Sequence, residues 1–420
     1  DIELVTLTHS ILEPNALAIR TPLGLVLHTG DWKIDSGPVV GGDIDEARLR
    51  AIGDEGVRAI VCDSTNVFTP GTSGSEADVA SSLVTLLSQC TGRVAVTTFA
   101  SNVARLESII RAGEAVGRHP VLVGRSMHRV VAAAREAGYL HDLPEIVSED
   151  DAGYLPRESV LFVCTGSQGE PRAALARIAE DSHPGIVLEK GDTVIFSSRV
   201  IPGNETSIFD LQNRLSERGI RIVTEKDHFV HVSGHPCRDE LAAMYQWIRP
   251  EVAIPVHGEA RHLAEHAALA RELQVPEQIV VRNGLMVRLA PGAAEVIDEA
   301  HSGRLYLDGD VLTEEDEGAV QERRRLAFAG SVFVSVVLDG KGEVRGEPQV
   351  RLMGLPEEDS HGVTFEDRAL DAVDDAFGRL PKKRRGNDGD VAEFLRRAIR
   401  GALRREWGKK PQVEVVVTRI

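Results

Sequence analysis

The stretch VLFVCTGSQGEPRAALARIA, residues 160–179, holds the strand, loop and helix that decide the fold. Its first five residues are apolar and predict a buried strand, the glycine-containing loop predicts a tight turn, and the alanine-rich end predicts a helix. Comparable strand–helix pairs occur throughout residues 75–234. Continuous apolar strands that alternate with amphipathic helices favour a parallel sheet covered on both faces. We therefore expect a separate α/β domain in the middle of the chain.

The segments outside this block have a different pattern, with a hairpin near the start and short strands further on. A Gly-, Asp- and Glu-rich stretch at 308–318 is typical of a solvated linker, and the residues after it predict a small α+β domain. The elements expected on either side of the block are strands at 4–7, 15–20, 25–28, 57–62, 252–256, 279–282, 286–289 and 295–298, and helices at 45–53, 237–248 and 261–273.

Composition excludes some classes of protein. A net charge of -17 over 420 residues argues against a protein that coats nucleic acid non-specifically. The length suggests two to three domains. Cys62, Cys90, Cys164 and Cys237 form no CxxC pair, so we expect reduced core thiols in a cytoplasmic protein. No apolar run is long enough to cross a membrane, and we expect no membrane partner.

Three residues at predicted strand ends have the chemistry of metal ligands. His9 and Asp31 follow strands near the start of the chain, and His257 follows the strand 252–256. Imidazole and carboxylate are ligands that a divalent metal such as zinc prefers. Each residue taken alone is explained as well by a turn or a helix cap, so the metal hypothesis depends on their convergence. His28 lies within its strand and is expected to pack.

A histidine-rich segment, 227–235, is expected to be extended, because its valines, Gly234 and Pro236 disfavour a helix. Ser233 and His235 can then both point at a phosphate, with Gly234 allowing close approach, and His235 can act as a general acid. Asp63 ends the strand 57–62 and can orient a ligand histidine, although an Asx-turn explains the same residue.

Three loops have the composition of phosphate cradles, at 99–102, 165–170 and 202–205. Exposed backbone N–H groups and a helix dipole favour anions at such places. A turn followed by a helix cap explains each loop equally well. Their common position at the carboxyl edge of one predicted sheet, where ligands of α/β proteins bind, makes the set more informative than its members.

Taken together, these segments resemble the ribonuclease J family of the metallo-β-lactamase superfamily, whose members carry an inserted β-CASP domain. The resemblance rests on 8–11 (THSI), 28–33 (HTGDWK), 62–66 (CDSTN), 164–171 (CTGSQGEP), 231–235 (HVSGH) and 255–259 (PVHGE). It implies the metallo-β-lactamase αββα fold without its N-terminal part in residues 1–75 and 236–305, and a β-CASP parallel α/β domain in 76–235. A linker at 306–328 and a C-terminal α+β domain at 329–420 complete the expected organisation.

The resemblance also implies a role for each candidate metal residue. His9 is expected to bind one metal ion, His257 a second, and Asp31 to bridge the two. Asp63 is expected to support these ligands and to take part in catalysis. The implied cofactors are two divalent ions, zinc or alternatively manganese.

Residues that hold the substrate phosphate are implied in the same way. His235 is expected to contact the scissile phosphate or to protonate the leaving oxygen. Ser233 and Gly234 are expected to hold phosphate beside it. From the composition of the predicted cradle at 165–170, Gly166 and Ser167 are also expected to bind substrate phosphate.

One motif of the family, His-x-His-x-Asp-His, does not occur in the sequence. In the family it supplies most of the metal ligands. We therefore expect this chain alone to bind metal weakly and to be inactive, and its sheet to have an unpaired edge.

The function implied by the resemblance is hydrolysis of single-stranded RNA, as a 5′-to-3′ exonuclease that prefers a 5′-monophosphate and as an endonuclease. The implied processes are mRNA decay and rRNA maturation. The implied partners are RNA, a second or further copies of the chain bound through the C-terminal domain as a homodimer or homotetramer, and an RNA-decay helicase. Two alternatives are another hydrolase of the same fold, acting on esters or thioesters, and a scaffold without catalysis.

Overall fold

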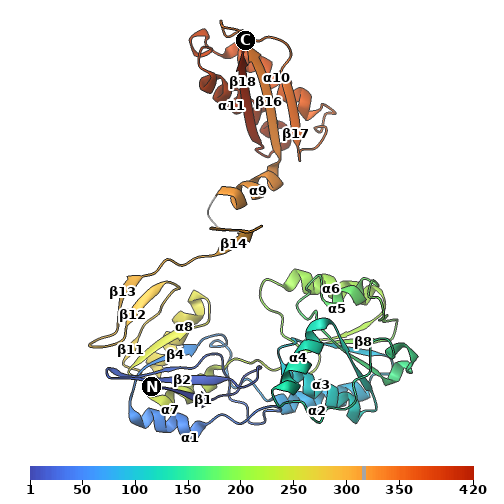
Figure 1. Ribbon diagram of the computed structural model, residues 1–420, viewed down its shortest axis with the longest axis vertical. Helices are drawn as coiled ribbons and strands as arrows, with labels where there is room; N and C mark the ends of the chain where they lie inside the picture. The colour runs from blue at the N-terminus through green and yellow to red at the C-terminus, as the bar shows by residue number, and fades with distance from the viewer. Residues whose placement is uncertain (315–317) are drawn as a thin grey trace. The chain divides into compact units, whose positions relative to one another are not determined.

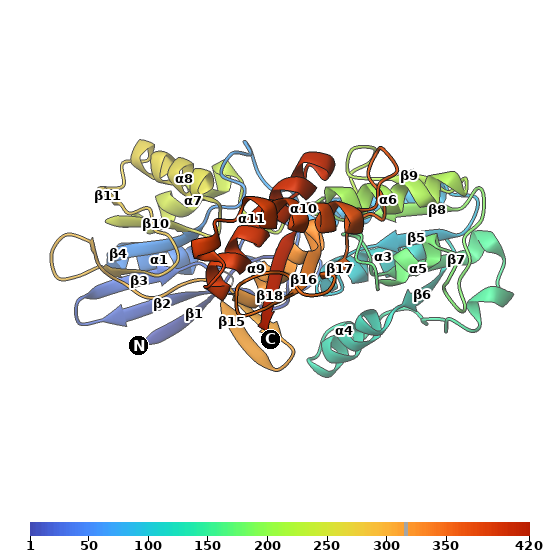
Figure 2. The same ribbon diagram turned by 90° about the horizontal axis from the view of Figure 1, so that it is seen from above.

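The computed structural model describes residues 1–314 and 318–420. The chain divides into two compact units, Asp1–Ala300 and His301–Ile420 (Figures 1 and 2). The first unit contains two sheets, one of six and one of five strands, and the second contains a three-stranded sheet. The architecture is therefore mixed α/β, as the sequence predicts.

The six-stranded sheet has the order β1-β2-β3-β4-β10-β11. Its first three strands form an antiparallel meander, and β3, β4, β10 and β11 are parallel to one another. Their carboxyl ends therefore lie at one edge of the sheet. The strands are β1 (Ile2–Thr6), β2 (Asn15–Thr21), β3 (Gly24–His28), β4 (Val57–Asp63), β10 (Val252–Val256) and β11 (Glu277–Gln278).

Helices α1 (Glu46–Glu55), α7 (Arg238–Ile248) and α8 (Ala260–Glu272) supply the core of this sheet. Leu49 of α1, Met244 of α7 and Leu269 of α8 pack with the buried side chains of the strands. A smaller cluster around Ala59 and Ile254 lies on the alternate strand positions. The hairpin of β12 (Leu285–Arg288) and β13 (Glu295–Glu299) follows.

The five-stranded sheet lies between β4 and α7 in the sequence and has the order β6-β7-β5-β8-β9, with all neighbours parallel. Alternate side chains of each strand enter two different cores, so that Val94 packs on one face and Ala95 on the other. Its strands are β5 (Val94–Thr97), β6 (His119–Val123), β7 (Val160–Cys164), β8 (Thr193–Phe196) and β9 (Arg221–Val223).

Helices cover both faces of this sheet, which confirms the doubly covered parallel sheet predicted from the apolar strands. Three helices pack on one face: α2 (Glu76–Ser88), α3 (Val103–Ala115) and α4 (Arg125–Glu136). Two pack on the other: α5 (Ala174–Ala179) and α6 (Glu205–Glu217).

The second unit begins with a hairpin of β14 (Leu305–Asp308) and β15 (Val311–Glu314), and α9 (Gly318–Ala329) precedes its sheet. The sheet has the order β17-β16-β18, and α10 and α11 pack on one face of it. Its elements are β16 (Ser331–Leu338), β17 (Gln349–Met353), α10 (Phe365–Arg379), α11 (Asp388–Trp407) and β18 (Gln412–Arg419).

Three expectations differ from the structure. The range 306–328, expected as a linker, contains most of the β14–β15 hairpin and of α9, while residues 315–317 lie outside the described residues. The strand expected at 279–282 is replaced by the two-residue β11, because only Glu277 and Gln278 pair with β10. His28, expected to pack, is exposed, since it is the last residue of β3. In the described part of the chain no helix is both long and apolar enough to span a membrane.

Candidate functional site

Residues far apart in the sequence converge at the carboxyl edge of the six-stranded sheet. Ligand atoms of Asp31, Asp63, His235 and His257 all lie within 4.8 Å of one another. The ring centroid of His235 lies 5.0 Å from that of His9 and 5.3 Å from that of His257. The structure therefore brings together the three predicted metal ligands and the predicted catalytic pair.

Strand pairing explains this convergence. Asp63 ends β4 and pairs with Val256 of the parallel strand β10, so that His257 follows at the same level. His257 has a φ of +55°, a left-handed conformation that is uncommon for a residue other than glycine. Residues held in such conformations cluster at functional sites. The turn after β10 thus presents the imidazole at the sheet edge.

Asp63 and His235 form a hydrogen-bonded pair. His235 Nδ1 lies 2.6 Å from Asp63 Oδ2, while Asp63 Oδ1 accepts from Thr65 N at 2.8 Å and Thr65 Oγ1 at 2.7 Å. Burial alone raises the pKa of Asp63, but the hydrogen bond with His235 and the Thr65 contacts hold it below its ordinary value. Burial alone lowers the pKa of His235, but Asp63 raises it above its ordinary value. Both Asp63 oxygens are engaged, which suits a supporting carboxylate.

His9 is oriented by the backbone of the histidine-rich segment. Its Nδ1 donates to the carbonyl of Gly234, and its remaining ring nitrogen, Nε2, has only a weak 3.4 Å contact with Ser10 Oγ. Burial lowers the pKa of His9, although the Gly234 carbonyl opposes this. A Cβ at Gly234 would lie 2.6 Å from His9 Cε1, so the approach requires glycine. The Nε2 lone pair is left available to a cation.

The donor set fits a divalent metal ion. His257 Nε2 and Asp31 Oδ1 are 3.6 Å apart, and their side chains are 51% and 42% exposed. Two ligands of one tetrahedral zinc ion at about 2.0–2.1 Å lie roughly 3.4 Å apart, close to this separation. Two imidazoles and a carboxylate with an accessible lone pair each are suitable ligands. We infer that His9, Asp31 and His257 are the residues that would hold metal.

Ser233 lies where the sequence predicted it, beside His235. Its Oγ accepts from Asn66 Nδ2 at 2.8 Å and from His235 N at 3.1 Å, and Asn66 Nδ2 also donates to the His235 carbonyl at 3.0 Å. Asn66 thus ties the end of β4 to the segment that carries His235. Sequence reasoning quoted Asn66 only as part of a motif and gave it no role.

Gly166 and Ser167 lie at the carboxyl edge of the five-stranded sheet, in the loop after β7. The neighbouring Gln168 joins two of the predicted cradles, because its Oε1 accepts from Asn204 Nδ2 of the 202–205 loop at 3.3 Å. Its side chain also donates to the Arg199 carbonyl at 2.8 Å and accepts from Ile201 N at 3.0 Å. Within the described residues, no direct contact connects Gly166 or Ser167 with His235. Their role in phosphate binding stays a prediction.

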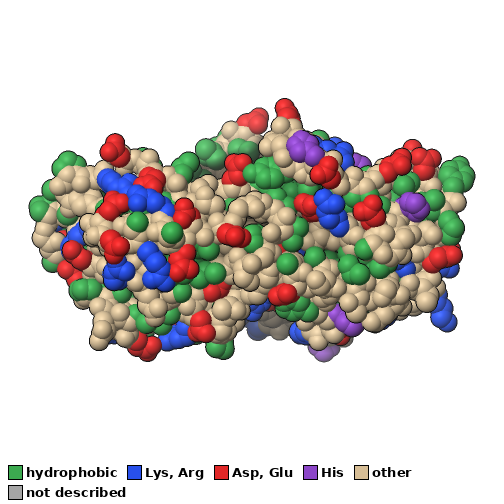
Figure 3. Space-filling view, turned by 90° about the horizontal axis from the view of Figure 1, so that it is seen from below, with side chains coloured by type: hydrophobic (Ala, Val, Ile, Leu, Met, Phe, Trp, Pro, Cys, Tyr) green, Lys and Arg blue, Asp and Glu red, His purple; other side chains and the backbone are tan. Residues whose placement is uncertain are grey.

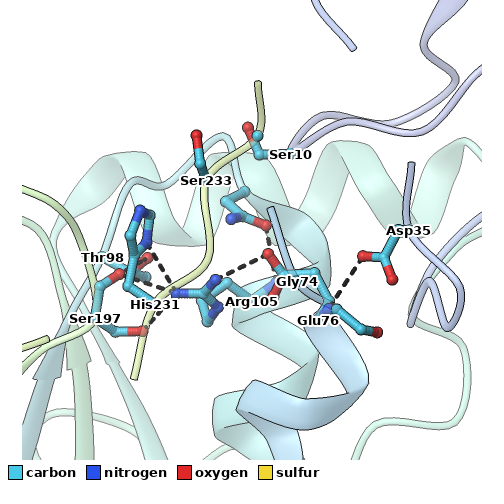
Figure 4. A network of polar contacts seen from close by, with 12 residues as sticks. Ser10, Asp35, Gly74, Glu76, Thr98, Arg105, Ser197, His231 and Ser233 are labelled. Carbon is cyan, nitrogen blue, oxygen red and sulfur yellow. Dashed lines mark hydrogen bonds and ion pairs between the residues drawn. The ribbon is translucent and has the colours of Figure 1, made fainter. Parts of the chain in front are cut away.

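A buried ion pair supports the other end of the histidine-rich segment (Figure 4). Arg105 of α3 makes two hydrogen bonds of 2.8 Å to the carboxylate of Glu76 at the start of α2. The same guanidinium donates to Ser197 Oγ at 2.8 Å and to the Val230 carbonyl at 3.0 Å. Ser197 Oγ donates to the same carbonyl at 2.7 Å. The segment is therefore anchored inside the five-stranded half.

The network continues into the six-stranded half. Glu76 N donates to Asp35 Oδ2 at 3.0 Å, and Asp35 forms a 2.7 Å ion pair with Lys33, both side chains being buried. Lys33 Nζ also donates to the Gly74 carbonyl at 3.1 Å. Buried charges of this kind require partners, because an unpaired charge in the interior is costly. The two halves of the first unit thus share one polar network.

Sequence reasoning missed Arg105, Glu76 and His266. Burial and the charge of Arg105 hold the pKa of His231 at about 3, so this imidazole is neutral. His266 lies between Ser64 Oγ at 2.8 Å and the Tyr245 hydroxyl at 2.9 Å, and burial lowers its pKa to about 4. Their positions could have indicated burial, because Arg105 and His266 lie within or beside the runs of apolar residues on the buried faces of α3 and α8.

Comparison with known proteins accounts for most of the chain. Residues 91–215 match the family model of the ribonuclease J β-CASP domain, and residues 318–420 match that of the ribonuclease J C-terminal domain. Residues 219–281 match the model of the Zn-dependent metallo-hydrolase RNA specificity domain. The last match agrees with divalent metal use and with the cluster at the sheet edge.

Relatives named Ribonuclease J align along the chain. The chain is 50% identical over 419 residues to that of Sinorhizobium meliloti, covering 100% of the chain and 74% of the relative. It is 40% identical over 427 residues to that of Mycolicibacterium smegmatis, covering 100% and 75%. It is 37% identical over 417 residues to that of Corynebacterium glutamicum, covering 98% of the chain and 58% of the relative. The chain therefore belongs to the ribonuclease J family, whose members are hydrolases that act on RNA.

Proposed function

We propose that the chain carries part of the phosphodiester-cleaving site of a metal-dependent ribonuclease that acts on single-stranded RNA. The observation that supports this most is the convergence of Asp31, His257, Asp63 and His235 within 4.8 Å, with His9 alongside. These donors come from three parallel strands and from a segment anchored in the inserted domain. Such a site faces both halves of the first unit.

The residues divide the chemistry between them. His9, Asp31 and His257 would hold divalent ions, zinc or manganese, which when bound would supply Lewis-acid stabilisation of negative charge on phosphate. Asp63 accepts from His235 Nδ1 and thereby fixes the ring, so that Nε2 is the nitrogen that can donate a proton to the phosphate or to the leaving oxygen. Ser233, Gly234 and the 165–170 loop position the strand.

The finer assignment follows the resemblance. We propose 5′-to-3′ exonuclease action with preference for a 5′-monophosphate, together with endonuclease action, in mRNA decay and rRNA maturation. All four cysteines are free and buried, which suits a reducing compartment and supports a cytoplasmic location.

Self-association through the C-terminal sheet belongs to the same proposal. Phe333, Met353 and Val416 lie on the sheet face away from α10 and α11 and are 46%, 63% and 55% exposed. A homodimer or homotetramer would cover them, and a helicase is the proposed further partner. Light scattering of the chain with and without residues 301–420 distinguishes assembly from a monomer.

Substitution of His257 tests the catalytic proposal in the full-length protein. His257→Ala should lower both the bound divalent metal and RNA cleavage, the latter at least a hundredfold. His141→Ala, which changes an exposed histidine away from the cluster, should change neither. If the His257 variant cleaves RNA at the parent rate with unchanged metal content, the proposal is wrong. An ester or thioester substrate that is turned over in place of RNA would favour the alternative hydrolase.

Residues 1–420 alone are proposed to bind metal weakly and to be inactive, because three ligands do not fill two metal sites. Elemental analysis after dialysis should find less than one ion per chain, with no RNA cleavage. Turnover at the rate of a complete ribonuclease J would contradict this.

A further inference from the structure

A hollow of about 680 Å³ lies in the inserted domain, and none of the metal or catalytic candidates His9, Asp31, Asp63, His235 and His257 lines it. It opens at the carboxyl ends of the neighbouring strands β6 and β7, beside Gly124 and Thr165. Four arginines line it: Arg125, Arg129, Arg172 and Arg177. Glu149 is the carboxylate that the same hollow contains.

These four guanidinium groups are not neutralised by the protein. Within residues 1–314 and 318–420, none of them makes an ion pair or side-chain hydrogen bond, and Glu149 lies 3.8 Å and 3.9 Å from His128 and His183 instead. Other arginines of the same domain are engaged, as Arg157 is with Asp192 and Arg214 with Glu180. On the face shown in Figure 3, Lys and Arg side chains are interspersed with Asp and Glu. Four cations against one carboxylate, in a chain of net charge -17, mark a local site for anions.

The backbone adds to this charge. α4 begins at the rim of the hollow. The N–H of its N-cap, Gly124, donates to Glu149 Oε1 at 3.4 Å, whereas its first turn has no side-chain cap. The free N–H groups of a helix start attract phosphate, and guanidinium groups bind phosphate oxygens in a bidentate manner. The volume is in the range of about 300–1,000 Å³ of small-molecule sites, which exceeds a single phosphate group.

We propose that this four-arginine hollow, defined by Arg125, Arg129, Arg172 and Arg177, binds a phosphate of single-stranded RNA away from the cleavage site. The inference rests on the proposed function for its ligand class. Thr165 lines the hollow and also starts the loop of Gly166 and Ser167, so the hollow lies along the same sheet edge. Its lining residues include no Phe, Tyr or Trp, and four of them are arginines, so positive charge dominates it. It therefore reads the sugar–phosphate backbone, independently of sequence.

Binding of labelled oligonucleotides to the 1–420 chain, in EDTA so that no cleavage occurs, tests this. The probes are a 12-nucleotide RNA carrying a 3′-fluorophore, with either a 5′-hydroxyl or a 5′-phosphate. Removing all four charges (R125Q, R129Q, R172Q and R177Q) should weaken binding at least tenfold at 0.1 M salt. The slope of log K against log salt should fall by about 0.7 for each phosphate that the variant no longer neutralises. Equal weakening for both probes assigns an internal phosphodiester; weakening confined to the 5′-phosphorylated probe assigns a terminal phosphate.

The matched control is Arg135→Gln, which removes an exposed charge from the same helix outside the hollow. It should change affinity less than twofold. If the quadruple variant, which lacks all four arginines, has an unchanged melting temperature and binds RNA as the parent does, the inference is overturned. It is also overturned if a polyglutamate of equal charge displaces RNA from the parent at equal concentration, since the hollow would then serve an acidic protein.

Cleavage and binding separate this inference from the proposed function. Loss of RNA cleavage in full-length His257→Ala, together with weakened oligonucleotide binding in the variant that lacks all four arginines, supports both. If His257→Ala retains cleavage, the proposed catalytic site is wrong. If the quadruple variant still shows weakened RNA binding in that case, the inference about the four-arginine hollow remains supported.

Discussion

The two sheets of the first unit are built differently. The five-stranded sheet is parallel throughout, and helices cover both of its faces. The six-stranded sheet has its large core on one face, while Ile2 and Leu4 of β1 are 69% and 66% exposed. In the described residues β1 pairs only with β2. The five-stranded sheet, which is covered on both faces, is therefore expected to be rigid. The candidate metal ligands lie at the edge of the six-stranded sheet, whose first strand is exposed.

The charged and polar residues of the two halves also differ in burial and in pairing. In the five-stranded half, Arg105 and Glu76 are buried and fully paired. At the edge of the six-stranded sheet, Asp31 and His257 remain about half exposed and lack comparable partners. A paired interior charge fixes a conformation, whereas an accessible donor can bind a ligand. Substitutions on the two sides should therefore have separable effects.

The largest effect is expected for Arg105→Met. The change leaves Glu76 buried without its partner, which costs about 3–5 kcal/mol when a buried pair is broken. Urea unfolding of the chain, with hydrogen exchange of the α3 amides, measures the destabilisation. Arg135→Met on α4 is the control and should stay within about 0.5 kcal/mol. A destabilisation below about 1 kcal/mol for Arg105→Met would contradict the anchoring role.

Acidification should destabilise the six-stranded half through His266. Its pKa is about 4 in the folded protein, lowered by burial and only partly opposed by Asp63, against an ordinary 6.5. As the pH falls through 6.5, the unfolded chain takes up a proton that the folded chain does not, so stability decreases until about pH 4. The expected decrease is about 3 kcal/mol over that window.

Comparison of the parent with His266→Gln, by urea unfolding between pH 7 and pH 4.5, isolates this contribution. The variant should be less stable at pH 7, where it lacks a packed imidazole, and less sensitive to pH. His141→Gln should follow the parent curve. Parallel pH curves for the parent and His266→Gln would show that the imidazole does not titrate as described.

Two glycines give a smaller, matched contrast between the halves. A Cβ at Gly53 of α1 would lie 2.1 Å from the Trp247 carbonyl oxygen, whereas a Cβ at Gly113 of α3 would meet the end of the Leu161 side chain at 2.4 Å. Gly53→Ala should cost about 1–3 kcal/mol, because backbone must move. Gly113→Ala should cost less than about 1 kcal/mol, because a side chain can rotate and alanine favours a helix. Thermal unfolding compares them, and the reverse order would show that α1 moves more readily than α3.

The smallest change in stability is expected on the exposed face of β1. Ile2→Thr and Leu4→Thr should alter the free energy of unfolding by less than about 0.5 kcal/mol. Both should raise solubility, since an open apolar strand edge promotes association. Precipitation by polyethylene glycol measures this. Destabilisation above about 1 kcal/mol would indicate that the face is covered in solution.

Sequence patterns predicted the elements well where periodicity was clear, as in the strand 160–164 that the structure reproduces as β7. They also placed His9, Asp31 and His257 at strand ends, where side chains from different strands can converge, although the order of those strands was not predicted. The Arg105–Glu76 pair was not predictable in this way, since a charged residue within a helix usually faces water. The β14–β15 hairpin was missed because its two-residue turn, Gly309-Asp310, lies in a stretch whose acidic composition is typical of linkers.

The segment that carries Ser233 and His235 is held at one end by Arg105 and at the other by Asn66 and His9. These anchors belong to different halves of the first unit, so the spacing between the two sheets sets the position of Ser233 and His235. A small molecule that wedged the two halves apart would pull on both anchors at once. An inhibitor of this kind would disable the imidazole cluster without competing with any metal ion.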